Sequence, residues 1–367
     1  SGDDPQRLAT LLKEYKYWGN QTCAGDGLCS MSCPMHINTG ELTHDIRQAE
    51  LPKGSTGYQM GDFAARHFAG IKNSLRPVLT LADTAHAVMG TTLMTSLTRG
   101  MHQTLGIPLW TPAMPKAYRI RKQLRNHITA KPDKVVYFPS CINQTMGLAR
   151  KSPEEMALVD KMVSLLQKGG FEVIFPKNMD KLCCGTIWES KGMMDIADRK
   201  SKELEEALWK ASEEGRYPVL CDQSPCLHRM RETIKKMKLY EPAEFIYTFL
   251  RDRLIFTPTD EPVAIHITCS MRRMGLADTI INVAKLCSKN VFVPEEIGCC
   301  GFAGDRGFTH PEVNAYALRK LRPQLEAKGI QQGYSNSRTC EIGLTTNSGV
   351  PYVSIAYLVD RCTRPKQ

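Results

Sequence analysis

The sequence predicts an α/β protein with two pseudo-repeated domains, each a small parallel sheet flanked by helices, preceded by a loop-rich segment and a helical region. Two observations predict this fold class. Short apolar runs typical of buried strands alternate with amphipathic stretches of helical period. The tripeptide Cys-Cys-Gly occurs twice, and each copy lies within the same order of cysteines and strand-like runs. We therefore divide the chain into residues 1–50, 51–132, 133–258 and 259–367.

The first segment is expected to form a ferredoxin-like loop around a group of cysteines. The run that begins at Cys23 reads Cys-Ala-Gly-Asp-Gly-Leu-Cys-Ser-Met-Ser-Cys-Pro. Cys23, Cys29 and Cys33 match the bacterial ferredoxin spacing C-x2-C-x2-C-x3-C-P, with Asp26 in place of its second cysteine. This spacing predicts an iron–sulfur site with Asp26 as a candidate ligand. The alternatives are a fourth ligand from elsewhere, a separate cluster for Cys33, a zinc loop, or free thiols.

The second segment is expected to be helical and to end in a linker. Residues 62–71 repeat apolar side chains at helical spacing. Three prolines between Leu105 and Pro115 interrupt that pattern. The basic run from Lys116 to Arg125 follows, and on a helix it would form one basic face. That face is either solvated or a docking surface for an acidic partner or anionic lipid headgroups.

The third and fourth segments repeat one another. Lys-Val-Val-Tyr-Phe-Pro-Ser-Cys ends at Cys141, and Pro-Val-Ala-Ile-His-Ile-Thr-Cys ends at Cys269. Met-Gly-Leu-Ala follows each of these cysteines at the same distance. Each run has the pattern of a buried strand that ends in a cysteine. Self-similarity of this length indicates duplicated domains rather than a short-period solenoid.

Each repeat is expected to alternate strand and helix. In the first, Ser152 and Pro153 are expected to open a helix as its N-cap and first-turn residue, and Gly169-Gly170 to end it. The other elements expected in the first repeat are strands at 135–138, 171–176 and 219–220 and a helix at 195–211. Those expected in the second repeat are strands at 263–267 and 291–293 and helices at 277–287 and from 311.

Each repeat offers four thiols at the ends of its expected strands. Adjacent cysteines are poor partners in a disulfide, and thiolates select soft metals, chiefly zinc and iron–sulfur clusters. Because ligands of open parallel sheets bind beyond the carboxyl ends of the strands, the four sulfurs of a repeat should meet at one edge of its sheet. The predicted sets are Cys141, Cys183, Cys184 and Cys226, and Cys269, Cys299, Cys300 and Cys340. The remaining thiols, Cys221, Cys287 and Cys362, are expected to be buried in the core.

Composition is typical of an intracellular metal protein. The chain has 14 cysteines in 367 residues, too few for a disulfide scaffold but strongly clustered. The sequence shows neither an apolar run long enough to span a membrane nor a signal peptide. The net charge is +10, but beyond the basic run from Lys116 to Arg125 nothing in the sequence indicates nucleic-acid binding, so no nucleic-acid partner is expected. We expect a cytoplasmic location, with peripheral contact to the inner face of the membrane as an alternative.

With these residues in view, the repeats resemble the cysteine-rich CCG domains of heterodisulfide reductase, glycolate oxidase and lactate-utilisation iron–sulfur subunits. Nearly the whole chain resembles, more closely, the C-terminal part of long bacterial FAD-linked D-2-hydroxyacid dehydrogenases of the D-lactate and D-2-hydroxyglutarate type. The likeness is carried by the run from Cys23 to Cys29, Asn38-Thr-Gly, Tyr-Phe-Pro-Ser-Cys141, Cys183-Cys-Gly, and Cys299-Cys-Gly-Phe-Ala-Gly-Asp-Arg-Gly. In the last of these, Asp305 and Arg306 are expected to cover a cluster, to contact a partner domain, or to form a local salt bridge.

Two features depart from the resemblance. The family motif closes with C-x2-C, but Gln223 and Ser337 occupy the first of those two positions. Each repeat therefore lacks one thiol of the five-thiolate cluster that the family can hold, unless Cys221 replaces it in the first repeat. A four-thiolate cluster, zinc and an empty site are the alternatives. The sequence also has no G-x-G-x-x-G after a strand. It begins at Ser1-Gly2 without an initiator methionine, so we expect the native protein to extend upstream and to carry FAD there.

The resemblance implies the iron–sulfur electron-transfer portion of an FAD-dependent D-2-hydroxyacid dehydrogenase, with clusters of the 4Fe-4S type. Electrons would pass from the flavin of an upstream domain or subunit to a quinone, a cytochrome or another acceptor. This chain alone is expected to be inactive towards the hydroxyacid. The alternatives are a zinc–thiolate structural or docking module, and a stand-alone CCG iron–sulfur subunit of a glycolate oxidase or heterodisulfide-reductase-like complex.

Overall fold

Two small parallel sheets flanked by helices form the body of the protein, as the sequence predicts. The computed structural model describes residues 4–120 and 132–366. The first sheet has the strand order β4 (Phe171–Ile174), β2 (Asp133–Phe138), β5 (Val219–Cys221) and β6 (Leu239–Tyr240). The second sheet has the order β11 (Tyr352–Val353), β10 (Gly333–Tyr334), β8 (Val263–Ile265) and β9 (Val291–Phe292).

The two sheets share one topology. Every strand pair within them is parallel. If the strands of each sheet are numbered in chain order, the first sheet has the spatial order second, first, third, fourth. The second sheet has the same order when it is followed from β9 to β11. The identical order supports the duplication predicted from the repeated sequence. It also puts the carboxyl ends of all the strands of a repeat on one edge, which is where the cysteines follow.

The helices of the repeats agree with most of the sequence-based expectations. One differs: α6 begins at Leu158 rather than after Ser152, because the Ser152 hydroxyl accepts a hydrogen bond from Glu154 N in a local turn instead of capping a helix. The helices of the first repeat are α6 (Leu158–Lys168), α7 (Thr186–Glu189), α8 (Met194–Ala211), α9 (Ser224–Thr233) and α10 (Pro242–Phe245). Those of the second are α11 (Cys269–Arg273), α12 (Ala277–Cys287), α13 (Arg306–Thr309), α14 (Pro311–Ala317), α15 (Leu321–Ala327), α16 (Arg338–Ser348) and α17 (Ile355–Arg361).

The repeated Met-Gly-Leu-Ala sequence adopts two different structures. In the first repeat it is strand β3 (Met146–Ala149), which pairs antiparallel with β1 (Pro115–Ala117). In the second repeat the same four residues form a turn at Gly275 and the start of α12. The partner strand β1 lies outside the repeat, so pairing with another segment of the same chain determines the structure of Met-Gly-Leu-Ala in the first repeat.

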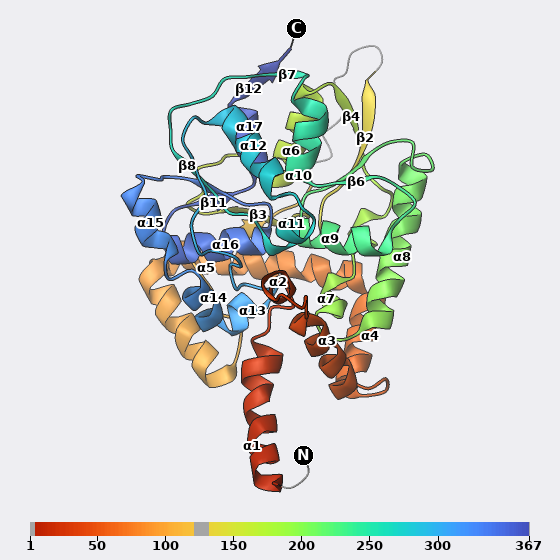
Figure 1. Cartoon of the computed structure of the whole chain (residues 1–367), viewed down its shortest axis with the longest axis vertical. Coiled ribbons are helices and arrows are strands. Elements are labelled where there is room, and N and C mark those ends of the chain that lie inside the picture. The colour runs from red at the N-terminus through yellow and green to blue at the C-terminus, as the bar shows by residue number, and fades with distance from the viewer. Residues whose placement is uncertain (1–3, 121–131, 367) are drawn as a thin grey trace.

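The N-terminal segment is more helical than the expected loop-rich structure. It contains α1 (Pro5–Tyr15), a π-helical turn at Lys16–Gln21, α2 (Leu28–Ser32) and α3 (Thr39–Glu50). Side chains cap two of these helices: Asp4 accepts from Arg7 N, and Asn38 accepts from Gly40 N. In Figure 1, α1 points away from the rest of the molecule, and the N- and C-termini lie at opposite ends.

The second segment is helical, as predicted, and ends in the expected linker. It contains α4 (Thr56–Arg66) and the long α5 (Phe68–Leu105), which is kinked at Gly90, where φ is 74°. Helix α5 runs across the molecule below the strands of both sheets in the view of Figure 1. Residues 106–114 then lead into β1. The basic run from Lys116 enters β1, and its part from residue 121 lies outside the described residues.

A shared apolar core joins the repeats. Alternate residues of β2 face opposite sides, so Val135 and Tyr137 enter a core formed with α6, α12 and α17, whereas Val136 and Phe138 face α8. The first core contains residues of both sheets, including Tyr334 of β10. Strand β12 (Thr363–Pro365) also pairs with β7 (Leu254–Phe256), which ties the C-terminal residues to the connection between repeats. Within the described ranges, no helix has both the length and the apolar character needed to cross a bilayer.

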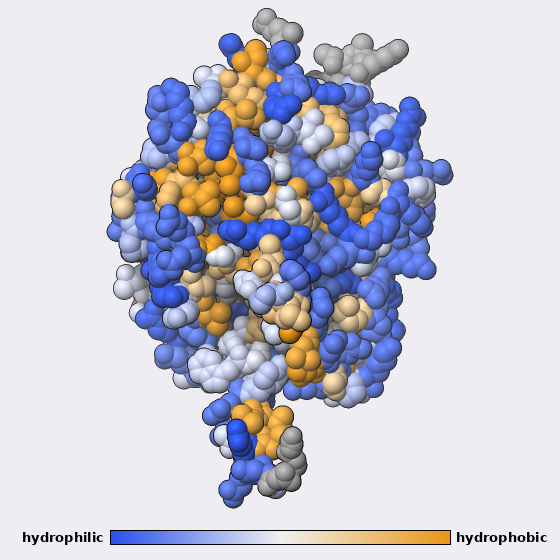
Figure 2. Space-filling view, in the orientation of Figure 1, coloured by the Kyte–Doolittle hydropathy of each residue, from blue (hydrophilic) through white to orange (hydrophobic). Residues whose placement is uncertain are grey.

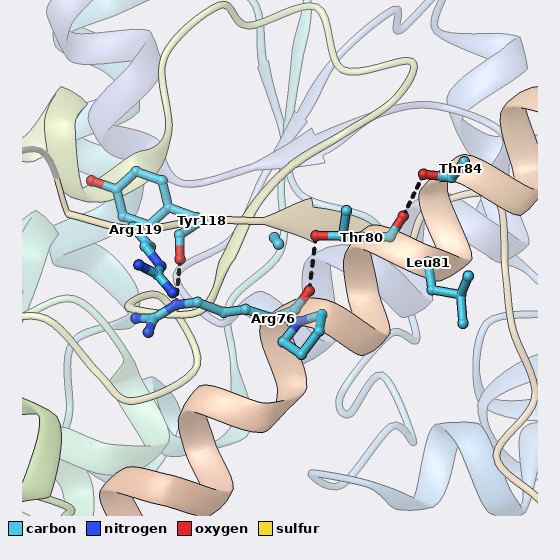
Figure 3. Close-up of a pocket in the computed structure, with 8 residues that line it drawn as sticks. Arg76, Thr80, Leu81, Thr84, Tyr118 and Arg119 are labelled. Atoms are coloured by element: carbon cyan, nitrogen blue, oxygen red, sulfur yellow. Dashed lines mark hydrogen bonds between the residues drawn. The ribbon is translucent and has the colours of Figure 1, made fainter.

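Helix α5 also borders an open hollow of about 620 Å³ beside β1. Figure 3 shows that the Arg76 guanidinium reaches the Tyr118 carbonyl, which accepts a hydrogen bond from Nε at 2.7 Å. The hydroxyls of Thr80 and Thr84 are satisfied by carbonyls of the preceding turn of α5. This hollow contains no thiol or carboxylate among its lining residues, and the Arg76 hydrogen bond beside it joins α5 to the segment that carries β1.

Candidate metal centres

The structure brings the four predicted thiols of the first repeat together at the carboxyl edge of its sheet. Cys141 follows β2, Cys183 and Cys184 follow β4, and Cys226 lies on α9, directly after β5. Their thiols form a continuous chain of hydrogen bonds from Cys141 through Cys183 and Cys184 to Cys226. Cys221 is buried at the end of β5, outside this chain of bonds.

One sulfur of the first set is held as the preferred thiolate. Hydrogen bonds from Cys183 and then Cys226 lower the pKa of Cys184 well below its usual range, although burial opposes this. The same contacts raise the pKa of Cys183 and Cys226. The Cys184 carbonyl is also fixed, because it accepts hydrogen bonds from Arg229 Nε at 3.0 Å and Ser201 Oγ at 2.8 Å.

The second repeat gathers its four thiols in the same way. Cys269 begins α11 after β8, Cys299 and Cys300 follow β9, and Cys340 lies on α16 after β10. Cys300 Sγ is 3.1 Å from Cys340 Sγ. Hydrogen bonds from Cys269 and then Cys300 lower the pKa of Cys299 well below its usual range. The ligand role of both sets stays a prediction, because within the described part of the chain neither set has three sulfurs that all lie within 4.8 Å of one another.

The glycine of each Cys-Cys-Gly motif explains why the motif recurs. Gly185 has φ of 92°, and a Cβ there would lie 2.4 Å from the Ala197 carbonyl oxygen of α8. Gly301 has φ of 70°, and a Cβ there would lie 2.9 Å from the Val313 carbonyl oxygen of α14. Both the left-handed backbone and the close helix exclude a side chain. The glycine therefore turns the chain immediately after its two thiols and seats them against a helix.

Asp26 lies at the second repeat rather than among the N-terminal cysteines, and this corrects its expected place. A carboxylate oxygen of Asp26 and the sulfurs of Cys269 and Cys299 all lie within 4.8 Å of one another. Burial raises the pKa of Asp26 to about 7, and the neighbouring Cys299 sulfur adds to this rise. The spacing of the cysteine run could not reveal this, because spacing along the chain does not fix the direction of a side chain in a turn.

Contacts with the second repeat explain the position of Asp26. The Arg306 guanidinium donates a hydrogen bond to the Cys23 carbonyl, so the second Cys-Cys-Gly motif holds the start of the N-terminal loop. The Arg273 side chain packs against the backbone of Gly27. The neighbouring Asp305 pairs with Lys191 of the first repeat at 2.9 Å. Asp305 and Arg306 thus make long-range contacts to two other parts of the chain and not a salt bridge with each other.

The three N-terminal cysteines occupy a separate place around α2. Cys29 Sγ accepts a hydrogen bond from the Thr39 hydroxyl at 3.2 Å, which lowers the pKa of Cys29. The backbone N–H of Cys33 donates to the Cys29 carbonyl at 3.0 Å, and Gly25 N lies 3.4 Å from Cys23 Sγ. Among the described residues, these thiols form no triad within 4.8 Å. With Asp26 directed elsewhere, this group retains three candidate ligands from its own run.

All eight thiols of the two repeats line one cavity of about 960 Å³. Asp26 and Arg273 lie on its wall, together with residues of α3, α4 and α5. The N-terminal segments therefore close a space onto which both thiol sets open. The two candidate centres therefore border one common space.

Lys72 of α5 is a residue of this cavity that the sequence did not single out. Its Nζ is buried and donates to Gln144 Oε1 at 2.6 Å. Burial lowers the pKa of Lys72 to about 8, and the nearby Cys141 sulfur opposes that change. A lysine in an amphipathic helix usually faces solvent, so no sequence signal marked it. The first set thus has a cation beside it where the second has a carboxylate.

The donor chemistry of both sets fits a soft metal centre. Each offers four thiols that are largely buried, and all 14 cysteines of the chain are free of disulfides. Several buried thiolates side by side are unfavourable unless a cation compensates their charge. Zinc and iron–sulfur clusters supply that compensation and prefer thiolate ligands.

Comparison with known proteins agrees with this geometry. Residues 135–231 and 263–345 each match the family model described as the CCG cysteine-rich domain. The chain therefore contains two CCG regions, and each includes the complete thiol set of its repeat. The chain is also 24% identical over 210 residues to lactate utilization protein A 1 of Bacillus mycoides (strain KBAB4), covering 52% of this chain and 84% of that protein.

Two solved structures show weaker likeness. An aspartate racemase of Picrophilus torridus aligns with a TM-score of 0.31 and 7% identity over 65% of this chain and 96% of its own. An aspartate racemase homologue from Pyrococcus horikoshii OT3 aligns with a TM-score of 0.24 and 12% identity over 63% and 96%. TM-scores this low do not establish a common fold.

Proposed function

We propose that this chain is an iron–sulfur electron-transfer module that serves the oxidation of a lactate-type 2-hydroxyacid. The observation that carries the proposal is the opening of two four-thiol sets onto one cavity. When bound, iron–sulfur clusters supply one-electron transfer at potentials that depend on burial and on hydrogen bonds to sulfur. The chain provides such hydrogen bonds: the Thr186 hydroxyl lies 3.3 Å from Cys184 Sγ, and the Thr39 hydroxyl donates to Cys29.

The substrate class rests on similarity. The CCG regions and the likeness to a lactate utilization protein support a redox role connected with lactate. The resemblance to FAD-linked D-2-hydroxyacid dehydrogenases extends the proposal to D-lactate or D-2-hydroxyglutarate as substrate and to FAD as electron donor. FAD would lie on an upstream domain or a separate subunit, and a quinone, cytochrome or other acceptor would receive the electrons. We place this activity in the cytoplasm.

An exposed apolar surface supports the proposal of a protein partner. Leu8, Leu11 and Leu12 of the projecting helix α1 are each more than half exposed. Figure 2 shows hydrophobic atoms on this projection, which stands clear of the body. Apolar side chains gathered on a helix that packs against little else mark interaction sites more often than isolated surface leucines do.

Anaerobic purification tests the proposed function. The protein should contain iron and acid-labile sulfide, show the broad visible absorbance of thiolate-to-iron charge transfer, and bleach on reduction with dithionite. Electron paramagnetic resonance of the reduced protein should then show a signal, and mixing with an oxidised quinone analogue should remove it. A protein that contains no iron after anaerobic purification and cluster reconstitution would contradict the proposal.

The compact group of Asp26, Cys269 and Cys299 favours a second candidate, a zinc–thiolate docking module. Donor atoms within 4.8 Å of one another suit a single ion, and structural zinc sites contribute folding free energy directly. Zinc at stoichiometric level without iron would support this candidate. Its removal by a chelator would then unfold the second repeat, whereas an electron-transfer site would mainly lose its colour.

A further inference from the structure

We propose that Asp26, from the N-terminal segment, is a ligand of the metal centre of the second repeat. Its neighbouring ligands would be the sulfurs of Cys269 and Cys299, and Cys300 and Cys340 are the remaining candidate sulfurs of the same centre. The inference rests on the proposed function only in that both need a metal at these cysteines. It holds for iron and for zinc.

Geometry is the first argument. Bonds from zinc to thiolate and to carboxylate are about 2.3 Å and 2.0–2.2 Å, so two donors on one ion lie no more than about 4.6 Å apart. The Asp26 oxygen and the sulfurs of Cys269 and Cys299 lie within 4.8 Å of one another before any ion draws them together. Among the residues that the structure describes, only these three of the chain's metal-binding side-chain types form such a group.

The second argument is that the repeat lacks a donor of its own. Ser337 stands where the resemblance expects a further thiol, and it is fully buried with its hydroxyl engaged elsewhere. Its Oγ accepts a hydrogen bond from Gln223 Nε2 at 3.1 Å and lies 3.4 Å from Thr339 Oγ1. Asp26 approaches from outside the repeat and supplies an oxygen donor instead.

The third argument is that hydrogen bonds and packing hold the Asp26 carboxylate and its loop in position beside the thiols. Asp26 Oδ1 accepts a hydrogen bond from Leu28 N at 3.1 Å, which orients the carboxylate. The loop is fastened to the second repeat by Arg306, and Leu28 packs over Gly298, next to Cys299. Fixed ligands of this kind lose little conformational entropy when a metal binds.

The first repeat offers a contrast. Lys72 approaches its thiols from α5, and a lysine cation cannot ligate a metal. Two centres built on one topology therefore receive opposite charges from the N-terminal segments. A carboxylate is a harder ligand than a thiolate, so the second centre should be the more tolerant of harder metals and the first should remain a purely sulfur site.

Cobalt binding tests the assignment, because the ligand-field and charge-transfer bands of Co²⁺ report the number of sulfur and oxygen ligands. Metal-free wild-type protein and the variants Asp26→Ala, Asp26→Asn and Asp26→Cys would be titrated with Co²⁺ alone under anaerobic conditions. Asp26→Asn keeps an acceptor for Leu28 N and so tests ligation with the loop intact. Asp45→Ala is the matched control, because Asp45 is an exposed carboxylate of the same segment and cavity.

We expect Asp26→Ala to weaken cobalt binding at one site by at least roughly 10-fold to 100-fold, because the loss of an outer-shell partner alone has an effect of that size. Asp26→Cys should strengthen the sulfur-to-cobalt charge-transfer absorbance, and Asp45→Ala should match the wild type. In a Cys299→Ala background the Asp26→Ala change should have no further effect, whereas in a Cys184→Ala background it should keep its full effect.

Two results would overturn the assignment. One is an Asp26→Asn protein that binds cobalt with the spectrum and affinity of the wild type. The other is an Asp26→Ala change that weakens cobalt binding equally in the wild-type and the Cys299→Ala backgrounds. A separate measurement tests the proposed function: zinc without iron in the anaerobically purified protein would contradict it. The cobalt measurement does not depend on that outcome.

Discussion

Gln223 Nε2 donates a hydrogen bond of 3.1 Å to Ser337 Oγ, across the boundary between the two repeats. Gln223 Oε1 in turn accepts a hydrogen bond from Arg338 N at 3.0 Å. These are the two positions at which the resemblance expects thiols. The residues that replace those thiols are therefore partners of one another, and the two substitutions form one contact rather than two separate losses.

This contact belongs to a buried polar seam between the thiol-bearing ends of the repeats. Ser224 N donates to the Asn336 carbonyl at 3.0 Å, and Arg338 Nε donates to Asn143 Oδ1 at 3.0 Å. Asn143 follows Cys141 by two residues, and Arg338 precedes Cys340 by two. The seam thus couples the loops of the two candidate centres directly.

Gln223→Ala is expected to destabilise the protein by about 1–3 kcal/mol, because it leaves the buried Arg338 N–H without a partner and leaves the Ser337 hydroxyl with Thr339 alone. Urea denaturation of the metal-free protein measures this change. The cost should be smaller when Ser337→Ala is already present, with a coupling of about 0.5–3 kcal/mol between the two changes. Strictly additive changes would show that the hydrogen bond does not join the repeats energetically.

Arg306→Ala is expected to loosen the loop that carries Asp26. The variant removes the charge-assisted hydrogen bond to the Cys23 carbonyl, so local opening should become about 10-fold to 100-fold more frequent. Hydrogen exchange followed by mass spectrometry should show faster exchange at residues 20–30 and unchanged exchange in β8. Asp305→Ala is the control, because its exposed ion pair with Lys191 contributes little. Equal exchange in both variants would contradict the anchoring role.

Much of the repeat architecture could be predicted because its signals are local. The strand before Cys141 and the helix at 277–287 show their character in short-range periodicity, and the structure has α12 over those same residues. The meeting of four thiols followed from a general property of parallel sheets: strands that run in one direction end on one edge. Neither inference required knowledge of contacts between distant residues.

The parts that could not be predicted depend on long-range contacts. Nothing in the cysteine run indicates that Asp26 reaches Cys299, because the contact depends on Arg306, far away in the sequence, holding the Cys23 carbonyl. Lys72 was overlooked for the same reason. The start of α6 was misplaced although Ser152 and Pro153 satisfy a local capping rule, since Ser152 instead closes a turn with Glu154. The helix at Thr39 was missed despite a usable signal, its Asn38 cap.

Stability should fall as pH rises from about 4.5 to 7 because of Glu241, which is fully buried at the seam. Burial raises its pKa from 4.5 to about 7, although hydrogen bonds from Asn336 and Ser224 oppose the rise. Across this window the folded protein keeps a proton that the unfolded chain has lost, so the folded state binds more protons and loses stability with increasing pH. For a fully buried carboxyl the effect is roughly 3 kcal/mol.

The Glu241→Gln variant isolates this contribution, because an amide does not ionise. Its unfolding free energy, measured with urea at several pH values, should decrease less between pH 4.5 and 8 than that of the wild type. Other buried carboxyl groups, such as Glu341, titrate equally in both proteins and cancel in the difference. Parallel curves for the two proteins would show that Glu241 keeps an ordinary pKa.

Cys29→Ser is expected to remove one centre and leave the repeats intact. Cys29 lies at α2, and its Sγ contacts Thr39 and Asn38, not the thiols of either repeat. Iron content after anaerobic purification should fall by one cluster's worth, with unchanged far-ultraviolet circular dichroism. Cys362→Ser serves as the control, since this thiol lies at the end of α17, outside the three groups, and bonds the Cys287 carbonyl. Loss of all iron in Cys29→Ser would mean that the centres do not load independently.

The chain alone is expected not to oxidise D-lactate or D-2-hydroxyglutarate. Oxidation of a 2-hydroxyacid removes two electrons together, a step that flavin or nicotinamide cofactors perform, whereas iron–sulfur clusters take electrons singly. The sequence has no G-x-G-x-x-G motif that would hold such a cofactor. Dye reduction should therefore be absent with hydroxyacid alone, appear when a flavin-bearing partner is added, and appear without substrate when the chain is first reduced with dithionite. Substrate-dependent dye reduction by the isolated chain would contradict this assignment, in which a flavin oxidises the substrate and the thiolate-bound centres only transfer the electrons.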